Sequence, residues 1–357
     1  MGDTNDSLLS QEYFGTKIAV LSYEVFLPII VIVGLVANVF AFCVWVFGPK
    51  SKSMCCAIYF AANSAVDFLL LTEPPLWNDG LRQSNWSIDI PRTDVTCKLF
   101  YSLYLSCVLL SSGISAIITV ERSLTVLFPF HFKCQNMKKR SKRVIAIIVV
   151  LQPFIQSLQL YYIKKDKETM FCEFFEQWAY ILYYNIVSIF FVLLIPLIVV
   201  VVFNVATVTT LSRQRIRSQI VSGSRRHASG FTKLTIMTGA SLVFSFTPVC
   251  VVMVYNLFAR EQSDFVFQIF PLVYILSFLN SLMNPVICFI VCKSTRYDLK
   301  HFLGVLTRKI RHLFIGMCKS PQQEVQTTRM NTASRGLESV ELNTADAGTT
   351  AISSSRY

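Results

Sequence analysis

Long apolar runs alternate with short polar segments along most of this chain. A helix needs about 20 mostly apolar residues to span a bilayer. Seven runs reach that length, at residues 22–47, 55–76, 98–126, 144–163, 179–211, 232–259 and 265–292. Backbone groups in hydrocarbon must be hydrogen-bonded within their own segment, so we expect every run to be a helix. The pattern predicts an all-α membrane protein, a seven-transmembrane helix bundle.

Two of the seven runs depart from the simplest pattern. The second run carries Asp67 and Glu73 and ends at Pro74-Pro75. The fifth run fits either one long helix or a helix followed by a loop. We nevertheless assign both to the membrane domain, which we place at residues 22–293.

Polar segments flank this domain on both sides. Residues 1–21 are predicted to form an extracellular N-terminus without a cleavable signal peptide. In residues 294–316, aromatic and aliphatic residues recur at helical spacing among Lys and Arg, which predicts a short amphipathic helix on the anionic inner leaflet. Cys318 follows it and is either a palmitoylation site or a plain cysteine. Residues 317–357 are rich in Ser and Thr and are predicted to be a disordered cytoplasmic tail.

The distribution of charge predicts the orientation of the chain. The net charge is +12, although only 15% of the residues are charged and 53% are hydrophobic. Lys and Arg gather between runs one and two, three and four, five and six, and after run seven, whereas the other loops mix signs. The positive-inside rule places the basic loops in the cytoplasm and the N-terminus outside. We therefore expect a multi-pass plasma-membrane protein with lipid contacts, and no nucleic-acid partner.

Features of the predicted outer side agree with this orientation. Asn5 and Asn85 stand in Asn-X-Ser sequences that fit the glycosylation pattern. Of the eleven cysteines, only Cys97 and Cys172 fall in predicted extracellular positions. An oxidising exterior favours a disulfide between them over two free thiols.

An ordered set of motifs runs through the seven helices. Run three ends in Glu121-Arg122-Ser123, and run five contains Pro196. Run six contains Phe246 and Pro248, and run seven contains Asn280-Ser281 and Asn284-Pro285 with Cys288. Together with Gly34, Asn38, Asp67 and Cys97, their order resembles that of rhodopsin-like (class A) G-protein-coupled receptors over about residues 22–305. The sequence is most similar in appearance to invertebrate neuropeptide or chemosensory receptors.

The resemblance implies roles for these motifs. Glu121, Arg122 and Ser123 would form the G-protein-coupling site, and Arg122 would pair with Glu121 in one state. Pro196, Phe246, Pro248, Asn284, Pro285 and Cys288 would form the activation motifs. Several positions depart from the family pattern: Ser123, Asn204 and Cys288 replace tyrosines, Phe246 replaces a tryptophan, and Ala228 stands where some members have an acid.

Asp67 is a carboxylate in the middle of a predicted span. Such a group is costly in hydrocarbon and is usually functional or paired. Asn38, Ser111, Asn280, Ser281 and Asn284 are expected at the same depth. The resemblance implies that these residues hold a structural sodium ion, and no other cofactor is expected. The alternative is a polar network that satisfies itself through water.

The predicted outer half offers candidate ligand contacts. Phe278 aligns with the retinal-binding lysine of opsins and Tyr104 with the aspartate of amine receptors, so neither ligand class is expected. We expect a pocket of aromatic and acidic residues suited to a basic peptide. Its candidate residues are Glu73, Tyr101, Tyr104, Glu173, Tyr255 and Tyr274. The alternative is an interfacial belt of aromatic residues.

The favoured function is a receptor that binds an extracellular ligand, with a neuropeptide as first choice, and activates a heterotrimeric G protein. Arrestin is a further expected partner, recruited by the tail. A chemosensory receptor of the same fold is the alternative, and an ion-coupled transporter is less favoured because no internal repeats are visible. We expect no enzymatic activity, since all four histidines lie in predicted cytoplasmic segments.

Overall fold

The computed structural model describes residues 17–18, 20–54, 56–77, 93–128, 134–165, 172–174, 176, 189–222, 230–258 and 264–318. Asn5, Asn85 and the tail from residue 319 lie outside these ranges, as do residues 179–188 of the fifth predicted run. The chain divides into two units, residues 1–299 and residues 300–357. The first unit contains the membrane domain.

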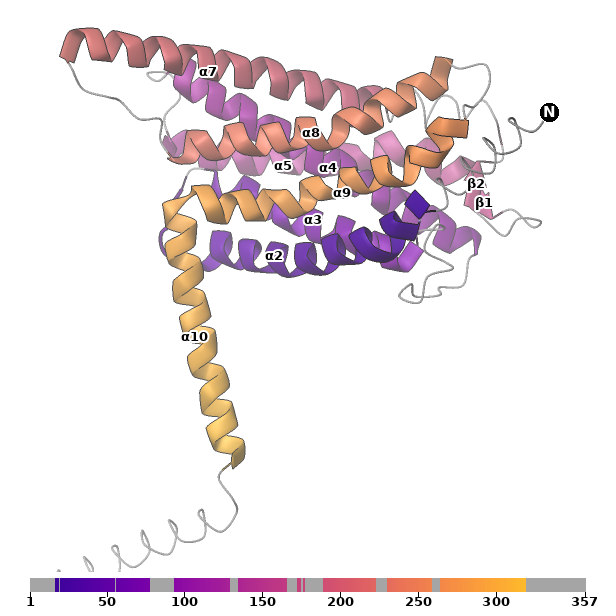
Figure 1. Cartoon of the computed structure of the whole chain (residues 1–357), viewed down its shortest axis with the longest axis horizontal. Coiled ribbons are helices and arrows are strands. Elements are labelled where there is room, and N and C mark those ends of the chain that lie inside the picture. The colour runs from indigo at the N-terminus through magenta and orange to yellow at the C-terminus, as the bar shows by residue number, and fades with distance from the viewer. Residues whose placement is uncertain are drawn as a thin grey trace, which may run out of the picture. The chain divides into compact units, whose positions relative to one another are not determined.

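Seven described helices correspond to the seven predicted spans, and Figure 1 shows them running alongside one another. They are α2 (Leu27–Phe47, preceded by the π-helical η1, Leu21–Phe26), α3 (Ala57–Trp77), α4 (Asp94–Leu127), α5 (Cys134–Tyr162), α7 (Ile195–Ser222), α8 (Gly230–Phe258) and α9 (Asp264–Val291). Helix α4 contacts α3, α5, α7 and α8, so it forms the centre of the bundle. The predicted all-α class is confirmed.

Helix boundaries differ from the predicted ones mainly at α7, which ends at Ser222, eleven residues beyond the predicted end at 211, and at α5. Helix α5 begins at Cys134, ten residues before the predicted start at 144, and it includes the basic segment that the sequence pattern assigns to a loop. Lys and Arg are good helix formers, and their long side chains let a helix extend beyond the apolar layer. Among the described residues, five helices are long and apolar enough to cross a membrane, and α3 and α5 are the two spans that fall short.

Apolar side chains cover the outside of the bundle, and polar side chains are buried inside it among the apolar core. Ile32 of α2, Val150 of α5 and Phe244 of α8 are more than 60% exposed. Asn38, Asp67 and Asn280 are at most 1% exposed. This arrangement suits a lipid surround, where apolar side chains gain nothing by turning inward and polar ones must find partners within the bundle.

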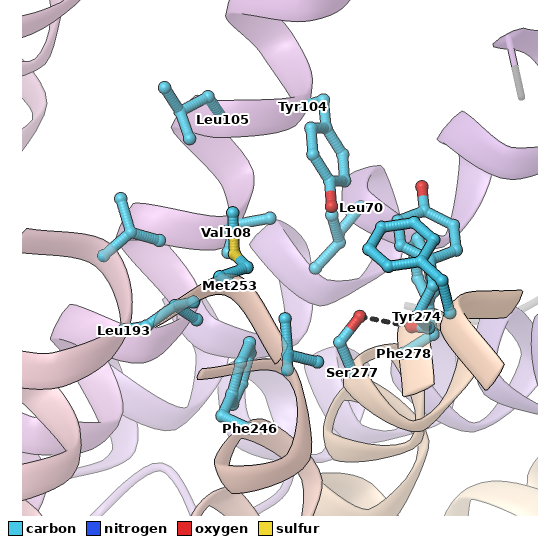
Figure 2. Close-up of a pocket in the computed structure, with 13 residues that line it drawn as sticks. Leu70, Tyr104, Leu105, Val108, Leu193, Phe246, Met253, Tyr274, Ser277 and Phe278 are labelled. Atoms are coloured by element: carbon cyan, nitrogen blue, oxygen red, sulfur yellow. Dashed lines mark hydrogen bonds between the residues drawn. The ribbon is translucent and has the colours of Figure 1, made fainter. Parts of the chain in front are cut away.

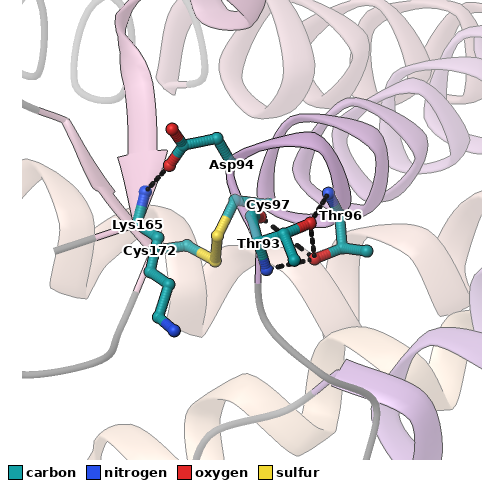
Figure 3. Close-up of a disulfide and its surroundings, with 6 residues drawn as sticks. All are labelled: Thr93, Asp94, Thr96, Cys97, Lys165 and Cys172. Atoms are coloured by element: carbon teal, nitrogen blue, oxygen red, sulfur yellow. Dashed lines mark hydrogen bonds between the residues drawn. A yellow bond between two sulfur atoms is a disulfide. The ribbon is translucent and has the colours of Figure 1, made fainter. Parts of the chain in front are cut away.

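A short hairpin and a disulfide mark one end of the bundle, which we call the disulfide end. Strand β1 (Ile163–Lys165) follows α5 and pairs antiparallel with β2 (Cys172–Phe174), with Lys165 opposite Cys172. Cys172 is bonded to Cys97 in the first turn of α4, with 5.5 Å between their Cα atoms (Figure 3). The predicted bridge is confirmed.

The start of α4 is also fixed by hydrogen bonds. Thr93 caps the helix through a reciprocal pair of bonds with Thr96, which satisfies backbone donors that have no partner within the helix. The Asp94 carboxylate accepts a bond of 2.8 Å from the backbone N–H of Lys165 (Figure 3). The hairpin is therefore held to α4 by a polar contact as well as by the covalent one.

At the opposite end, the turn after α2 is tied to the first turns of α10 (Lys293–Cys318). Asp298 is 2% exposed and accepts hydrogen bonds from the backbone N–H groups of Lys50 (3.1 Å) and Ser51 (2.7 Å). A Cβ on Gly48 would lie 2.6 Å from the Asp298 carboxylate and 2.4 Å from the Val44 carbonyl, so this turn requires glycine. The sequence pattern did not predict this contact.

Helix α10 extends from residue 293 to residue 318, slightly longer than the predicted 294–316. In the second unit, Leu303, Leu306 and Ile310 recur at helical spacing and are 38–43% exposed. Cys318 is its last residue. The amphipathic pattern predicted for this segment is thus carried by a continuous helix.

Candidate functional site

A cavity of about 80 Å³ lies inside the bundle, toward the disulfide end (Figure 2). It is bounded by α3, α4, the π-helical turn 189–194, α8 and α9. Its lining residues are Leu70, Tyr104, Leu105, Val108, Val192, Leu193, Phe246, Val249, Met253, Phe270, Tyr274, Ser277 and Phe278. A single buried water needs about 10–15 Å³ on this measure, so the cavity has room for several waters or a small ligand group.

One wall of the cavity is an aromatic ladder on α9. Phe270, Tyr274 and Phe278 are four residues apart, so their rings lie on one face of the helix. Phe270 stacks on Tyr274 with ring centroids 6.2 Å apart, and Tyr274 meets Phe278 edge-on at 5.1 Å. Phe246 of α8 adds a fourth ring and is 4% exposed.

Only some of the expected ligand contacts line this cavity. Tyr104 and Tyr274 do, whereas Glu73 is buried at 7% exposure and is not a lining residue. Tyr101 instead packs against the disulfide cluster of Cys97, Ile163 and Cys172. Tyr255 is 45% exposed and is not a lining residue. Glu173 is placed in β2, opposite Lys164, but its side chain is outside the described part of the chain.

Pro196 interrupts the backbone hydrogen bonding at the start of α7, beside the cavity. Proline has no N–H, so the carbonyl four residues earlier, that of Val192, loses its helical donor. The hydroxyl of Ser112 on α4 donates to this carbonyl at 3.0 Å. Ser112 and Val192 therefore join α4 to the π-helical turn that lines the cavity. The sequence pattern did not single out Ser112, although the missing donor at Pro196 could have prompted a search for a partner.

Besides the cavity, the bundle contains a polar centre at Asp67, where α2, α3, α4 and α9 meet. Ser111 lies two turns beyond Tyr104 on α4, so this centre is about 10 Å deeper than the Tyr104 level. Asp67 Oδ1 accepts from Ser111 (2.6 Å) and Ser281 (3.0 Å), and Oδ2 accepts from Asn63 (2.6 Å) and Asn284 (2.9 Å). Ser111, Ser281 and Asn284 of the expected cluster thus meet at Asp67, with Asn63 as an additional member, whereas Asn280 makes no hydrogen bond to Asp67.

The donor set around Asp67 fits a hard cation such as sodium. Asn38 donates to the Ser281 carbonyl at 3.0 Å, which adds α2 to the cluster. The side-chain oxygens of Asn38, Asn63 and Asn280 are buried and have no hydrogen-bond partner among the described residues. Hard cations prefer oxygen ligands, and such oxygens need either an ion or water.

Arg122 lies about 16 Å beyond Ser111 along α4, at the end of the bundle opposite the disulfide. We call it the Arg122 end. Glu121 is 5% exposed, and its Oε1 atom pairs with Arg140 Nε of α5 at 2.7 Å and accepts from the Tyr59 hydroxyl at 3.1 Å. Arg122 is directed at the thiol of Cys56. Glu121 thus forms an ion pair between α4 and α5, and the pairing of Glu121 with Arg122 in one state stays a prediction.

Ser123 makes the next contact along α4. Its hydroxyl donates to the Phe203 carbonyl of α7 at 2.9 Å and accepts from Thr207 at 2.7 Å. Asn204 of α7, another departure from the family pattern, faces Gly239 of α8, where a Cβ would lie 2.2 Å from the amide nitrogen. Small residues thus let α4, α7 and α8 approach closely at this end.

Cys288 is buried at 1% exposure, beside the start of α10. The Thr295 hydroxyl donates to the carbonyls of Cys288 and Cys292, both at 2.9 Å. These bonds join the end of α9 to α10. Asn284, a member of the Asp67 centre, and Cys288 are therefore one turn apart on α9.

Comparisons with known proteins relate the whole arrangement to one group. Residues 37–287 match the family described as "7 transmembrane receptor (rhodopsin family)". Human (Homo sapiens) Proteinase-activated receptor 3 is 22% identical over 287 residues, which cover 76% of this chain and 71% of that receptor. Mas-related G-protein coupled receptor member X2 is 27% identical over 270 residues in Homo sapiens and 28% over 274 residues in Pongo pygmaeus, covering 73% of this chain and 74% of each receptor.

Proposed function

This chain belongs to the rhodopsin family of seven-transmembrane receptors, and on that premise we propose that it binds an extracellular peptide and activates a heterotrimeric G protein. Members of this family are multi-pass membrane receptors that signal through G proteins, and they are not enzymes. The observation that carries the proposal is one helix, α4, that lines the internal cavity with Tyr104 and carries Glu121-Arg122 at its far end. A single rigid element thus connects a ligand cavity to a coupling motif.

We place the disulfide end outside the cell and the Arg122 end inside. The disulfide requires an oxidising compartment, which supports this orientation. The basic residues of α5 and α10 would then face the anionic inner leaflet. With that orientation, Glu121, Arg122 and Ser123 are the contact site for the G protein, and the tail beyond Cys318 is the proposed arrestin-binding segment.

A peptide is the proposed ligand class. The hairpin at the disulfide end brings Lys164 and Glu173 opposite each other, and Glu176 is exposed nearby in the sequence. Such a charged edge suits a polypeptide more than a small volatile compound. The name of one similar receptor states activation by proteinases, enzymes that cut polypeptides, which also favours a peptide here. A chemosensory ligand is the alternative.

The proposal is tested by nucleotide exchange. The purified receptor in lipid nanodiscs is combined with Gα proteins of each class, and GTP analogue uptake is measured with pooled synthetic peptides and with a panel of small volatile compounds. We expect a peptide pool to accelerate exchange, with Arg122→Ala inactive and the exposed control Arg143→Ala active. Acceleration by the volatile panel alone would favour the chemosensory alternative. No exchange with any Gα protein, from a receptor with its disulfide formed, would overturn the coupling function.

We further propose that the Asp67 centre binds sodium. The residues that would hold the ion are Asp67, Ser111, Asn280, Ser281 and Asn284. An ion that prefers the inactive state shifts the equilibrium by its difference in affinity between the two states. Coupling effects of this kind are typically about 5- to 150-fold.

Asp67→Asn is expected to remove a sodium effect on the activating peptide. In the wild type, replacing potassium by sodium at constant ionic strength should lower peptide affinity about fivefold or more. In the variant, both salts should give the same affinity, because the amide carries no charge to hold the cation. Competition binding in the two salts measures this, with the exposed Arg143→Ala as a control outside both the centre and the cavity. A wild-type receptor that is indifferent to sodium would leave the cluster as a water-filled network.

A further inference from the structure

We infer that the cavity receives an uncharged aromatic or aliphatic group of the ligand, rather than the basic group that the acids expected from the sequence suggest. The inference rests on the proposed function, since it names the ligand chemistry of the same receptor. Its basis is the set of 13 lining residues in the part of the chain that the structure describes, none of which is an acid or a base. In place of the aromatic and acidic pocket expected from the sequence, the described lining forms an apolar chamber.

The charge balance of the lining argues against a cation. Burying an ammonium or guanidinium group without a partner costs several kcal/mol. Neither of the acids expected in the pocket is among the described lining residues: Glu73 is buried on α3, and Glu173 belongs to β2. A basic residue of a peptide would therefore bind outside the chamber, while an uncharged one enters it.

The shape of the chamber argues for an aromatic or branched group. The ladder of Phe270, Tyr274 and Phe278 offers ring faces and edges on one side, and Figure 2 shows Phe246 below it. Leu105, Val108, Val192 and Leu193 form an aliphatic wall from α4 and the π-helical turn. An inserted ring extends the ladder, and such aromatic pairs contribute about 0.5–1.5 kcal/mol beyond their burial.

The Ser277 hydroxyl on α9 is a polar group in the lining that can orient a bound ligand group. The Ser277 hydroxyl donates its proton to the Tyr274 carbonyl at 2.6 Å (Figure 2), so toward the chamber it offers only lone pairs. It therefore accepts a hydrogen bond from a neutral donor, such as an amide N–H or a hydroxyl. The chemistry that fits is a neutral aromatic or aliphatic side chain with an adjacent peptide N–H.

Cysteine labelling tests this inference without a known ligand. Ser277→Cys is nearly isosteric and places a thiol in the chamber, and Met253→Cys places one on the facing helix α8. Each variant, purified in nanodiscs, is treated with neutral benzyl methanethiosulfonate or with its cationic trimethylammonium-ethyl counterpart. Peptide mass spectrometry gives the labelling rate at the new cysteine. Lys164→Cys, in the exposed hairpin, gives the reactivity ratio of the two reagents in water.

We expect the neutral reagent to be favoured at residues 277 and 253 by about tenfold over the ratio at residue 164, a difference of about 1.4 kcal/mol. Adding Val108→Phe, which fills the chamber, should slow labelling of residue 277 by the neutral reagent. This substitution does not change the partition of the reagent into lipid, so a slower rate reports on the chamber itself. Equal rates, faster cationic labelling, or no effect of Val108→Phe would overturn the inference. Nucleotide exchange is measured on the same variants. A failure of G-protein coupling is thereby distinguished from a failure of the chamber to favour the neutral reagent over the cationic one.

Discussion

Replacing both Cys97 and Cys172 by alanine is expected to remove most of the receptor from the cell surface. The bridge closes a loop of sequence separation 75 and holds the hairpin against the first turn of α4. A native disulfide of this kind typically contributes about 2–4 kcal/mol. A loss of about 1–2 kcal/mol already changes cellular abundance several-fold.

The contacts around the bridge explain why its loss would also destabilise the packing of the hairpin against α4. Cys97 and Ile163 are at most 1% exposed and Cys172 is 5% exposed, and Phe100 and Tyr101 pack against this cluster. Without the covalent bond, β1 and β2 retain only their short ladder and the bond from Lys165 to Asp94. The hairpin would then detach from α4 and expose apolar surface during folding.

Flow cytometry of an N-terminally tagged receptor measures the result, with total expression followed in parallel. Cys43→Ala is the matched control, because Cys43 is a half-buried free cysteine on α2. The double replacement avoids the unpaired thiol that either single change would leave. Surface levels within about twofold of wild type would show that the hairpin docks without its bridge.

The sequence predicted helices better than it predicted contacts between them. Seven apolar runs predict seven helices because a bilayer leaves the backbone few alternatives. Asp67 was correctly expected to gather Ser111, Ser281 and Asn284, since a buried carboxylate needs donors from whichever helices face it. Asn63 was missed, although it is one helical turn before Asp67 and donates to it.

Contacts at the Arg122 end could not be predicted from local pattern. Glu121 has a basic neighbour in sequence, Arg122, yet it pairs with Arg140, 19 residues away. Adjacent residues on a helix point in different directions, about 100° apart, whereas Arg140 approaches from the facing helix. The choice depends on where α5 begins, and its start at Cys134 rather than 144 brings Arg140 into a helix.

The residues that line the cavity could not be predicted from the sequence either, because aromatic residues are frequent throughout the outer half of the bundle. Tyr101 and Tyr255 have the residue type expected of a ligand contact, but one packs on the disulfide cluster and the other faces outward. The residues that do line the chamber, such as Val108 and Leu193, look like ordinary core positions in sequence. Only the packing of α4, α8 and α9 distinguishes chamber from core.

The ion pair between Glu121 and Arg140 leads to the second large effect, on signalling without ligand. Glu121→Gln and Arg140→Gln are each expected to raise basal nucleotide exchange. We take this pair, with the Tyr59 bond, as a restraint on the inactive state, because it fixes the helix that carries Arg122 to α5. Arg122→Ala should instead abolish coupling, since it removes the proposed contact with the G protein.

Burial sets the size of this effect. Glu121 is 7% exposed at its side chain and Arg140 is 36% exposed, so the pair is intermediate between surface and core. Exposed pairs contribute about 0–1 kcal/mol, and breaking a fully buried one costs about 3–5 kcal/mol. A restraint of about 1.4 kcal/mol changes the ratio of active to inactive receptor tenfold. A several-fold rise in basal exchange is therefore expected from either substitution.

A double-mutant cycle separates this restraint from a general loosening of the Arg122 end. If Glu121 and Arg140 act through each other, the double substitution raises basal exchange no more than either single one, because the second change has nothing left to break. The exchanged pair, Glu121→Arg with Arg140→Glu, should recover part of the low basal level. Arg143→Gln, an exposed neighbour on α5, serves as the control and should leave exchange unchanged. Additive effects of the two Gln substitutions would mean that each residue acts on a different partner. The inactive state would then be restrained by other contacts, such as the bond of Tyr59 to Glu121 or the contact of Arg122 with Cys56.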